Sequence, residues 1–96
     1  MLEELKEQIV TYALEADRMG LCQHRSGNFS VRDQASGLIC MTPTGIDRRT
    51  MKPADVVVMD PQARVVEAIT GLRPTSEALM HLAAYEARPD AVAVVH

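Results

Sequence analysis

Aromatic residues are nearly absent from this sequence, which has no Trp, two Tyr and one Phe among 96 residues. A core built around aromatic side chains is therefore excluded. The interior has to be aliphatic, because Leu, Ile, Val, Ala and Met supply most of the 47% hydrophobic content. A chain of this length and composition is sufficient for one domain at most, with a modest core.

Cysteine, basic runs and long apolar runs are also scarce. Cys22 and Cys40 lie outside any CxxC motif, which favours free thiols in a reducing compartment. The net charge is −3 and the only basic cluster is Arg48, Arg49 and Lys52, which argues against nucleic-acid binding. No apolar run reaches a membrane-spanning length, and the acidic N-terminus does not resemble a signal peptide. We therefore expect a cytoplasmic protein whose partners are neither nucleic acids nor membranes.

The spacing of apolar residues predicts helices and strands in alternation. Residues 1–20 have the three- and four-residue spacing of an amphipathic helix, with Tyr12 on its apolar side and Lys6 on its charged outer face. The other predicted elements are a hairpin of residues 28–32 and 38–41, strands at 56–59 and 64–68, a helix ending near residue 87, and a strand at 91–96. This order indicates an α/β or α+β fold.

The final strand, residues 91–96, is strongly apolar, and we interpret it as a core strand. A stable domain rarely stops one residue after such a strand. Residues 1–96 are therefore expected to be the N-terminal part of a longer protein.

Thr75, Ser76 and Glu77 follow Pro74 and precede a run of good helix formers. Thr and Ser are favoured helix N-caps, so the pattern predicts a helix N-terminus here with Glu77 in the first turn. The free backbone N–H groups and positive dipole end of such a terminus can bind phosphate or carboxylate. Most capped helices bind nothing, so an ordinary cap and an anion site are both open from these residues alone.

Three short polar loops each join apolar elements and offer small polar side chains beside backbone N–H groups. They are Gly27-Asn28, Thr44-Gly45 and Thr75-Ser76. If these loops converge, they form a pocket for a dianion such as phosphate without needing Lys or Arg. Glu77 would then lie at the edge of that pocket. Residue spacing alone does not establish the convergence.

The three histidines differ in the roles that their sequence positions allow. His81 lies four residues after Glu77, so the two share a helix face, either as a metal-binding pair or as a surface contact. His24 lies in a loop, exposed or near the pocket. His96 ends a strand, where ligands and catalytic groups gather in α/β sheets.

Five motifs together carry a family resemblance over the whole chain. They are GNFSVR at 27–32, TPTG at 42–45, PTSE at 74–77, HLAAY at 81–85 and RPDAVAVVH at 88–96. In this order and spacing they resemble the class II aldolase/adducin family, nearest its L-fuculose-1-phosphate aldolase branch. The resemblance implies a three-layer α/β/α sheet with helices, truncated after a core strand, with residues 1–96 the N-terminal part of a single domain.

The resemblance also implies an activity. The family's aldolases are zinc-dependent lyases of carbohydrate metabolism that reversibly cleave a ketose 1-phosphate, such as L-fuculose 1-phosphate, to dihydroxyacetone phosphate and an aldehyde. They are typically homotetramers with the active site near a subunit interface. A sugar phosphate is thus the implied small-molecule partner and Zn²⁺ the implied cofactor.

Site roles follow from the resemblance, motif by motif. The pairs that hold the substrate phosphate in the family correspond to Gly27-Asn28, Thr44-Gly45 and Thr75-Ser76, with Thr75 where Ser is common. Glu77 matches the acid/base residue, which can also contact zinc. His96 matches the first histidine of the H-x-H zinc pair, whereas His81 matches a position that is not a ligand. The remaining zinc ligands would lie beyond residue 96, so the isolated chain is expected to be inactive.

Relatives with other activities are alternatives. Pentulose-phosphate 4-epimerases of the family tend to carry Asp at the position of Glu77, whereas methylthioribulose-1-phosphate dehydratases share Glu. A non-catalytic adducin-like module would lack the zinc histidines, and the presence of Glu77 with His96 argues against it. The identities of the sugar phosphate, the aldehyde and the metal are not determined by these residues.

Overall fold

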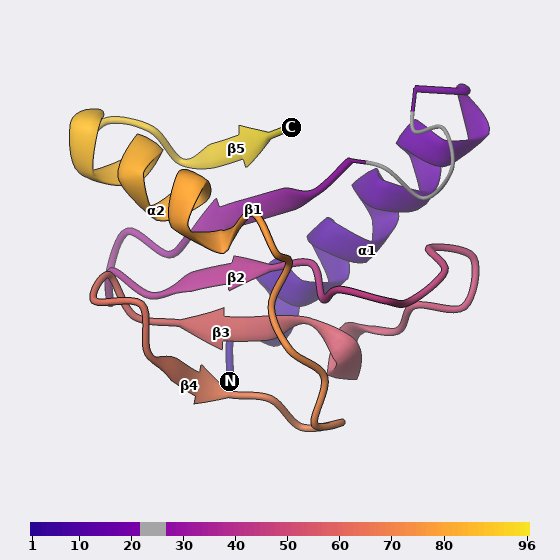
Figure 1. Ribbon diagram of the computed structural model, residues 1–96, viewed down its shortest axis with the longest axis horizontal. Coiled ribbons are helices and arrows are strands. Elements are labelled where there is room, and N and C mark those ends of the chain that lie inside the picture. The colour runs from indigo at the N-terminus through magenta and orange to yellow at the C-terminus, as the bar shows by residue number, and fades with distance from the viewer. Residues whose placement is uncertain (22–26) are drawn as a thin grey trace.

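The computed structural model describes residues 1–21 and 27–96, so Cys22 and His24 lie outside the described residues. Within them the order of elements alternates short strands with helices (Figure 1). The elements are α1 (Glu3–Arg18), β1 (Phe29–Arg32), β2 (Ile39–Met41), the 3-10 helix η2 (Pro53–Asp55), β3 (Val57–Met59), β4 (Val65–Glu67), α2 (Ala78–Ala87) and β5 (Ala93–Val95). The predicted hairpin is present as β1 and β2, which pair antiparallel with Val31 opposite Cys40.

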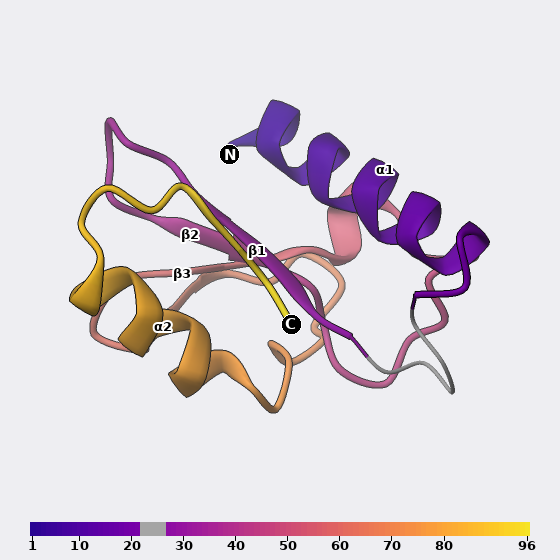
Figure 2. The same ribbon diagram turned by 90° about the horizontal axis from the view of Figure 1, so that it is seen from above.

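The strands form one sheet in the order β4-β3-β2-β1-β5, and every neighbouring pair is antiparallel. Figure 2 shows α1 on one face of the sheet and α2 on the other. The predicted three-layer α/β/α fold is therefore confirmed. Packing helices on both faces buries the central strands on both sides, which explains their continuous apolar sequences.

The side-chain alternation of β2 and β3 divides the core between the two faces. On the α2 side, Leu82 and Tyr85 belong to a buried cluster that includes alternate residues of both strands, Ile39, Met41, Val57 and Met59. On the α1 side, Ile9 packs with the intervening residues Cys40 and Val58. Burial raises the pKa of the Cys40 thiol to about 11, so this free cysteine is a packing residue.

The first helix differs from its predicted pattern at two residues. Ile9 and Ala13 are buried as predicted, and Gly20 adopts the left-handed φ of 74° that ends the helix. Lys6, however, is fully buried and not on the charged outer face, because its ammonium group bonds to the Glu67 carboxylate. Tyr12 is 63% exposed and not on the packed face, since the neighbouring Ala13 occupies that position.

Residues 91–96, predicted as the core strand after which the sheet is truncated, include β5 (Ala93–Val95). β5 pairs with β1 at the edge of the sheet, with Ser30 opposite Val94. Its Ala93 and Val95 side chains are exposed, and Val94 is half-buried. High apolar content reports a preference for burial, but position in the sheet decides whether burial is achieved.

Among the described residues no helix is both long and apolar enough to cross a bilayer.

Candidate functional site

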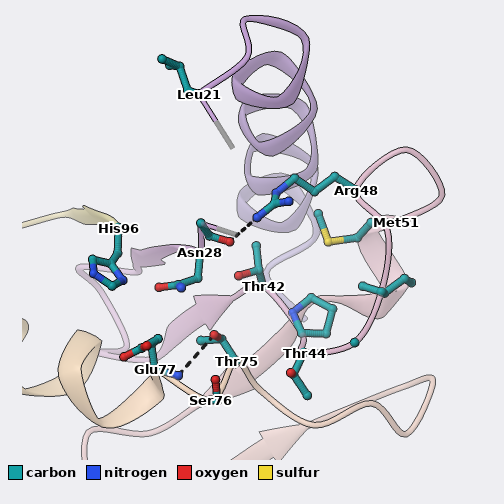
Figure 3. Close-up of a pocket in the computed structure, with 14 residues that line it drawn as sticks. Leu21, Asn28, Thr42, Thr44, Arg48, Met51, Thr75, Ser76, Glu77 and His96 are labelled. Atoms are coloured by element: carbon teal, nitrogen blue, oxygen red, sulfur yellow. Dashed lines mark hydrogen bonds between the residues drawn. The ribbon is translucent and has the colours of Figure 1, made fainter. Parts of the chain in front are cut away.

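A cavity of about 530 Å³ opens at the end of the sheet where β1 begins, β2 and β5 end, and α2 begins. All the site residues predicted from the sequence line it: Gly27, Asn28, Thr44, Gly45, Thr75, Ser76, Glu77 and His96. Figure 3 shows the side chains of Asn28, Thr75, Glu77 and His96 gathered on one side of this pocket. The structure therefore brings together segments that are up to about 70 residues apart in the sequence, which spacing alone could not establish.

Backbone hydrogen bonds hold His96 beside Asn28. The Asn28 N–H donates to the His96 carbonyl at 2.8 Å, and the His96 N–H donates to the Asn28 carbonyl at 2.9 Å. These bonds extend the antiparallel pairing of β1 with β5 by one residue pair. The predicted metal ligand and the predicted phosphate residue are thus direct cross-strand neighbours.

A second set of backbone bonds brings the Thr44 and Thr75 loops together. The Thr75 N–H donates to the Thr42 carbonyl at 2.9 Å, and the Thr44 N–H donates to the Arg73 carbonyl at 3.0 Å. An antiparallel bridge joins Pro43 to Pro74 between these bonds. Because neither proline has an N–H group, the bridge relies on the flanking residues for its donors.

These bonds use the backbone N–H group of one residue in each of the three loops. The N–H groups of Asn28, Thr44 and Thr75 are already used within the fold. What these three residues offer to the cavity is therefore their side-chain amide and hydroxyl groups. Hydroxyl and amide donors can bind phosphate oxygens as backbone N–H groups do.

α2 starts one or two residues later than the cap pattern predicted, because the predicted cap was Thr75 or Ser76. Glu77 occupies the N-cap position with φ −92° and ψ 13°, and its side chain makes no capping bond. Thr75 instead accepts a hydrogen bond from the Glu77 N–H on its hydroxyl at 3.3 Å, and the Ala78 N–H donates to the Thr75 carbonyl at 3.0 Å. A turn thus precedes the helix, because the pairing of Thr75 with Thr42 fixes its backbone outside the helix. Glu77 is left exposed at the cavity.

Arg48 is a cavity residue that sequence reasoning missed. Its side chain is 8% exposed, and its guanidinium donates to the Gly27 carbonyl (Figure 3). The sequence showed Arg48 only as one member of a surface basic cluster with Arg49 and Lys52, without a signal to separate them. Gly27 has φ 93°, a conformation that favours glycine, so Arg48 supports a loop that few other residues could form.

His81 is neither part of a metal pair with Glu77 nor a surface contact. It is fully buried, with its Nδ1 atom 2.6 Å from the Ser30 hydroxyl oxygen and its Nε2 atom bonded to Asn28 Oδ1. Burial first, and the nearby His96 second, lower the pKa of His81. The available signal was the i, i+4 spacing of His81 and Tyr85, which places both on the packed face of α2.

The donor groups at the cavity fit part of a metal site. His96 offers an imidazole nitrogen and Glu77 a carboxylate, both of which are ordinary zinc ligands. Among the described residues, no group of three or more His, Cys, Asp or Glu side chains is placed to hold a metal ion. These two residues can therefore supply part of a ligand set but not complete it.

Comparisons with known proteins give matches over almost the whole chain. A family model described as "Class II Aldolase and Adducin N-terminal domain" matches residues 7–96. The chain is 44% identical over 93 residues to an L-fuculose phosphate aldolase of Escherichia coli, covering 97% of the chain and 41% of the relative. It is 38% identical over 95 residues to an L-ribulose-5-phosphate 4-epimerase of Salmonella paratyphi C, covering 99% of the chain and 41% of the relative.

A solved structure described as L-fuculose 1-phosphate aldolase superimposes on 97% of the chain with a TM-score of 0.90 and 36% identity. The chain covers 43% of that structure. It thus spans less than half the length of these relatives.

Proposed function

The chain belongs to the class II aldolase and adducin family, and on this basis we propose that it carries the substrate-phosphate site and part of the zinc site of an aldolase. The reaction would be the reversible cleavage of a ketose 1-phosphate, such as L-fuculose 1-phosphate, to dihydroxyacetone phosphate and an aldehyde. The proposal rests on the observation that the three polar loops, Glu77 and His96 all line the same cavity. Because the chain spans about 41% of its curated relatives, the proposal concerns a protein that contains the rest of the domain.

The three loops are proposed to bind the phosphate group. Asn28 offers its side-chain amide, and Thr44, Thr75 and Ser76 offer hydroxyl groups around the same cavity. Gly45, with φ 76°, keeps the second loop free of a side chain where the ligand would approach. Binding at the phosphate is remote from the bond that breaks, so it positions the reacting carbons for the proton transfer.

Glu77 is proposed to be the acid/base residue. Its carboxylate is exposed at the cavity and held at the start of α2 by the bond from its own N–H to the Thr75 hydroxyl. When the carbon–carbon bond breaks, Glu77 would donate a proton to the carbon that becomes the hydroxymethyl carbon of dihydroxyacetone phosphate. In the condensation direction its carboxylate would remove the same proton.

Glu77 and His96 would hold the metal ion, with the remaining ligands contributed by the rest of the domain. When bound, zinc supplies Lewis-acid polarisation of substrate oxygens. The antiparallel pairing of Asn28 with His96 fixes the distance between the phosphate loop and this ligand. We extend the proposal to a homotetramer, as the family resemblance implies, and to a cytoplasmic location, as the composition of the sequence indicates.

A second candidate function is epimerisation of a pentulose phosphate. The 38% identity to an L-ribulose-5-phosphate 4-epimerase favours it. Glu77 favours the aldolase, because the epimerases of the family tend to carry Asp there. The two reactions give different products from the same substrate class, so a product assay separates them.

The test is an assay of the full-length protein with L-fuculose 1-phosphate and L-ribulose 5-phosphate in parallel. We expect dihydroxyacetone phosphate from the first substrate and a reduction in kcat of about 10²–10⁴-fold in Glu77→Gln, since the variant cannot move the proton. Glu86→Gln is the matched control, because Glu86 is an exposed residue of α2 outside the cavity.

Full activity of Glu77→Gln would remove Glu77 from the mechanism. Epimerisation of L-ribulose 5-phosphate without carbon–carbon cleavage of either substrate would replace the aldolase with the second candidate. Binding of inorganic phosphate should be retained in Glu77→Gln, because the phosphate loops are intact.

A further inference from the structure

We propose that a chain of hydrogen bonds from Tyr85 through Ser30 and His81 orients the Asn28 amide so that its amino group faces the cavity. His81 would thus be a positioning residue for anion binding at this site. The inference rests on the proposed function, because it takes phosphate binding by the Gly27-Asn28 loop as its starting point. It assigns a role to the buried polar groups beneath the cavity that line no part of it themselves.

The contacts run without a break from the core to the cavity. The Tyr85 hydroxyl oxygen lies 2.8 Å from the Ser30 hydroxyl oxygen, which lies 2.6 Å from His81 Nδ1. On the other side of the ring, His81 Nε2 bonds to Asn28 Oδ1. Tyr85, Ser30 and His81 are respectively 3%, 1% and 0% exposed, whereas Asn28 lines the cavity.

With Asn28 Oδ1 as the amide atom that faces His81, the hydrogen bonds of the chain have one direction. Asn28 Oδ1 can only accept a hydrogen bond, so His81 Nε2 must carry a proton. In a neutral imidazole Nδ1 is then the acceptor, and the Ser30 hydroxyl must donate to it. The Ser30 oxygen can still accept, and the Tyr85 hydroxyl donates to it. The two hydroxyl groups and the ring N–H then each donate one hydrogen bond, and at no contact do two donors or two acceptors face each other.

This direction decides what Asn28 offers to a ligand. With Oδ1 bonded to His81, the Nδ2 amino group, which has only N–H donors, is the part of the amide available to an anion. A flipped amide would instead present Oδ1, and an oxygen acceptor repels phosphate oxygens. The backbone N–H of Asn28 already bonds to His96, so the side chain is the main donor of this residue.

The donation from His81 to Asn28 does not depend on the charge of the ring. Nε2 carries a proton in both the Nε2–H neutral form and the imidazolium, so it can donate to Asn28 in either form. Burial lowers the pKa of His81, which favours the neutral form and with it the donation from Ser30 to Nδ1. In this chain of hydrogen bonds, here called the relay, His81 therefore donates to Asn28 on the cavity side and accepts from Ser30 on the core side.

The first test measures binding of inorganic phosphate to the full-length protein and three variants. His81→Phe removes both ring bonds, and we expect about tenfold weaker binding, on the scale of one charge-assisted hydrogen bond. His81→Gln keeps an amino group able to donate to Asn28 Oδ1, and we expect it to bind within about threefold of the wild-type affinity. Asn28→Ala shows the full effect of losing the amide.

A double variant separates positioning from general destabilisation. If His81 acts through Asn28, His81→Phe should weaken phosphate binding no further once Asn28 is alanine. Additive losses in the double variant would overturn the inference, as would wild-type affinity in His81→Phe.

The second test needs no variant. Long-range ¹H–¹⁵N correlation spectra of the wild-type protein distinguish the two neutral histidine tautomers, and we expect the Nε2–H form for His81. An Nδ1–H tautomer would reverse the chain and overturn the inference.

The two proposals fail in different ways. If the wild-type protein binds inorganic phosphate and the His81 variants bind it equally well, the relay is wrong and the proposed function is unaffected. If the wild-type protein binds neither inorganic phosphate nor a sugar phosphate while the Nε2–H tautomer is present, the proposed function is wrong. In that case the proposed role of the relay in phosphate binding is also wrong.

Discussion

At the scale of single residues, Lys6 shows how one buried charge joins distant parts of the chain. Its side chain is fully buried on α1, and its ammonium group bonds to the carboxylate of Glu67, the last residue of β4. The N-terminal ammonium of Met1 is 3.4 Å from the same carboxylate. The Lys6 hydrogen bond is the main reason that the pKa of Glu67 is lowered.

Removing the Glu67 charge is expected to leave Lys6 buried without its partner. We predict that Glu67→Gln lowers the apparent free energy of unfolding by about 1–3 kcal/mol, the penalty for a buried charged group that loses a hydrogen bond. Denaturant unfolding of the full-length protein measures it. Glu7→Gln is the control, since Glu7 is an exposed residue of the same helix as Lys6.

The Lys6–Glu67 pair also predicts that the stability of the protein depends on pH. The folded pKa of Glu67 lies below its unfolded value, so its contribution is complete above the unfolded pKa and is lost as pH falls through the folded pKa. The difference in stability between the wild type and Glu67→Gln should therefore narrow in acid. If the difference in unfolding free energy between the wild type and Glu67→Gln stayed constant until Glu67 is fully protonated, the Glu67 charge would not be the cause of that difference.

At the scale of elements, α2 connects the core to the site. Glu77 lies at its N-terminal end and His81 one turn later, while Leu82 and Tyr85 anchor its inner face on β2 and β3. The inner face therefore controls the positions of the proposed acid/base residue and the positioning residue together. A loss of packing under α2 should affect stability first and the geometry of the cavity second.

Leu82→Ala tests this anchoring. Leu82 is 8% exposed, and we predict a loss of about 2–5 kcal/mol in the apparent free energy of unfolding, as for other buried leucines. Leu79→Ala is the matched control on the same helix, because Leu79 is 71% exposed and its substitution should change stability by less than about 0.5 kcal/mol. Equal effects of the two substitutions in denaturant unfolding would contradict the observed orientation of α2.

At the scale of the whole molecule, the open edge of the sheet is the notable feature. β5 is an edge strand in which Val95 is 74% exposed, and Val92, just before the strand, is 51% exposed. Unpaired strand edges with apolar side chains are usually covered by other parts of a protein or by another subunit. The chain spans less than half of its relatives, which are long enough to supply such cover.

The proposed assembly gives a prediction at this scale. Light scattering of the full-length protein after size-exclusion chromatography should report four times the mass of one chain, independent of loading concentration across the working range. A stable monomer or dimer that retains full activity would contradict the proposed homotetramer.

The local elements could be predicted from the sequence because they depend on local patterns. The three- and four-residue apolar spacing of residues 1–20 predicted the first helix, and the strand patterns at 28–32 and 38–41 predicted the hairpin. The residues of the three loops could also be named in advance, since their motifs resemble those of a known family. Lys6, Arg48 and His81 were misread or missed, because a single sequence does not show which polar side chains find buried partners.

The sequence by itself determined the helices, the strands, the aliphatic core and the three polar loops that line the cavity, because propensities, apolar spacing and motifs act over short distances. Only the tertiary structure decided that β5 pairs with β1, that Thr75 pairs with Thr42, and that the N–H groups of Asn28, Thr44 and Thr75 are already used. It alone placed His81 between Ser30 and Asn28. Hydrogen bonds between residues far apart in the chain set these features, and local sequence patterns do not encode them.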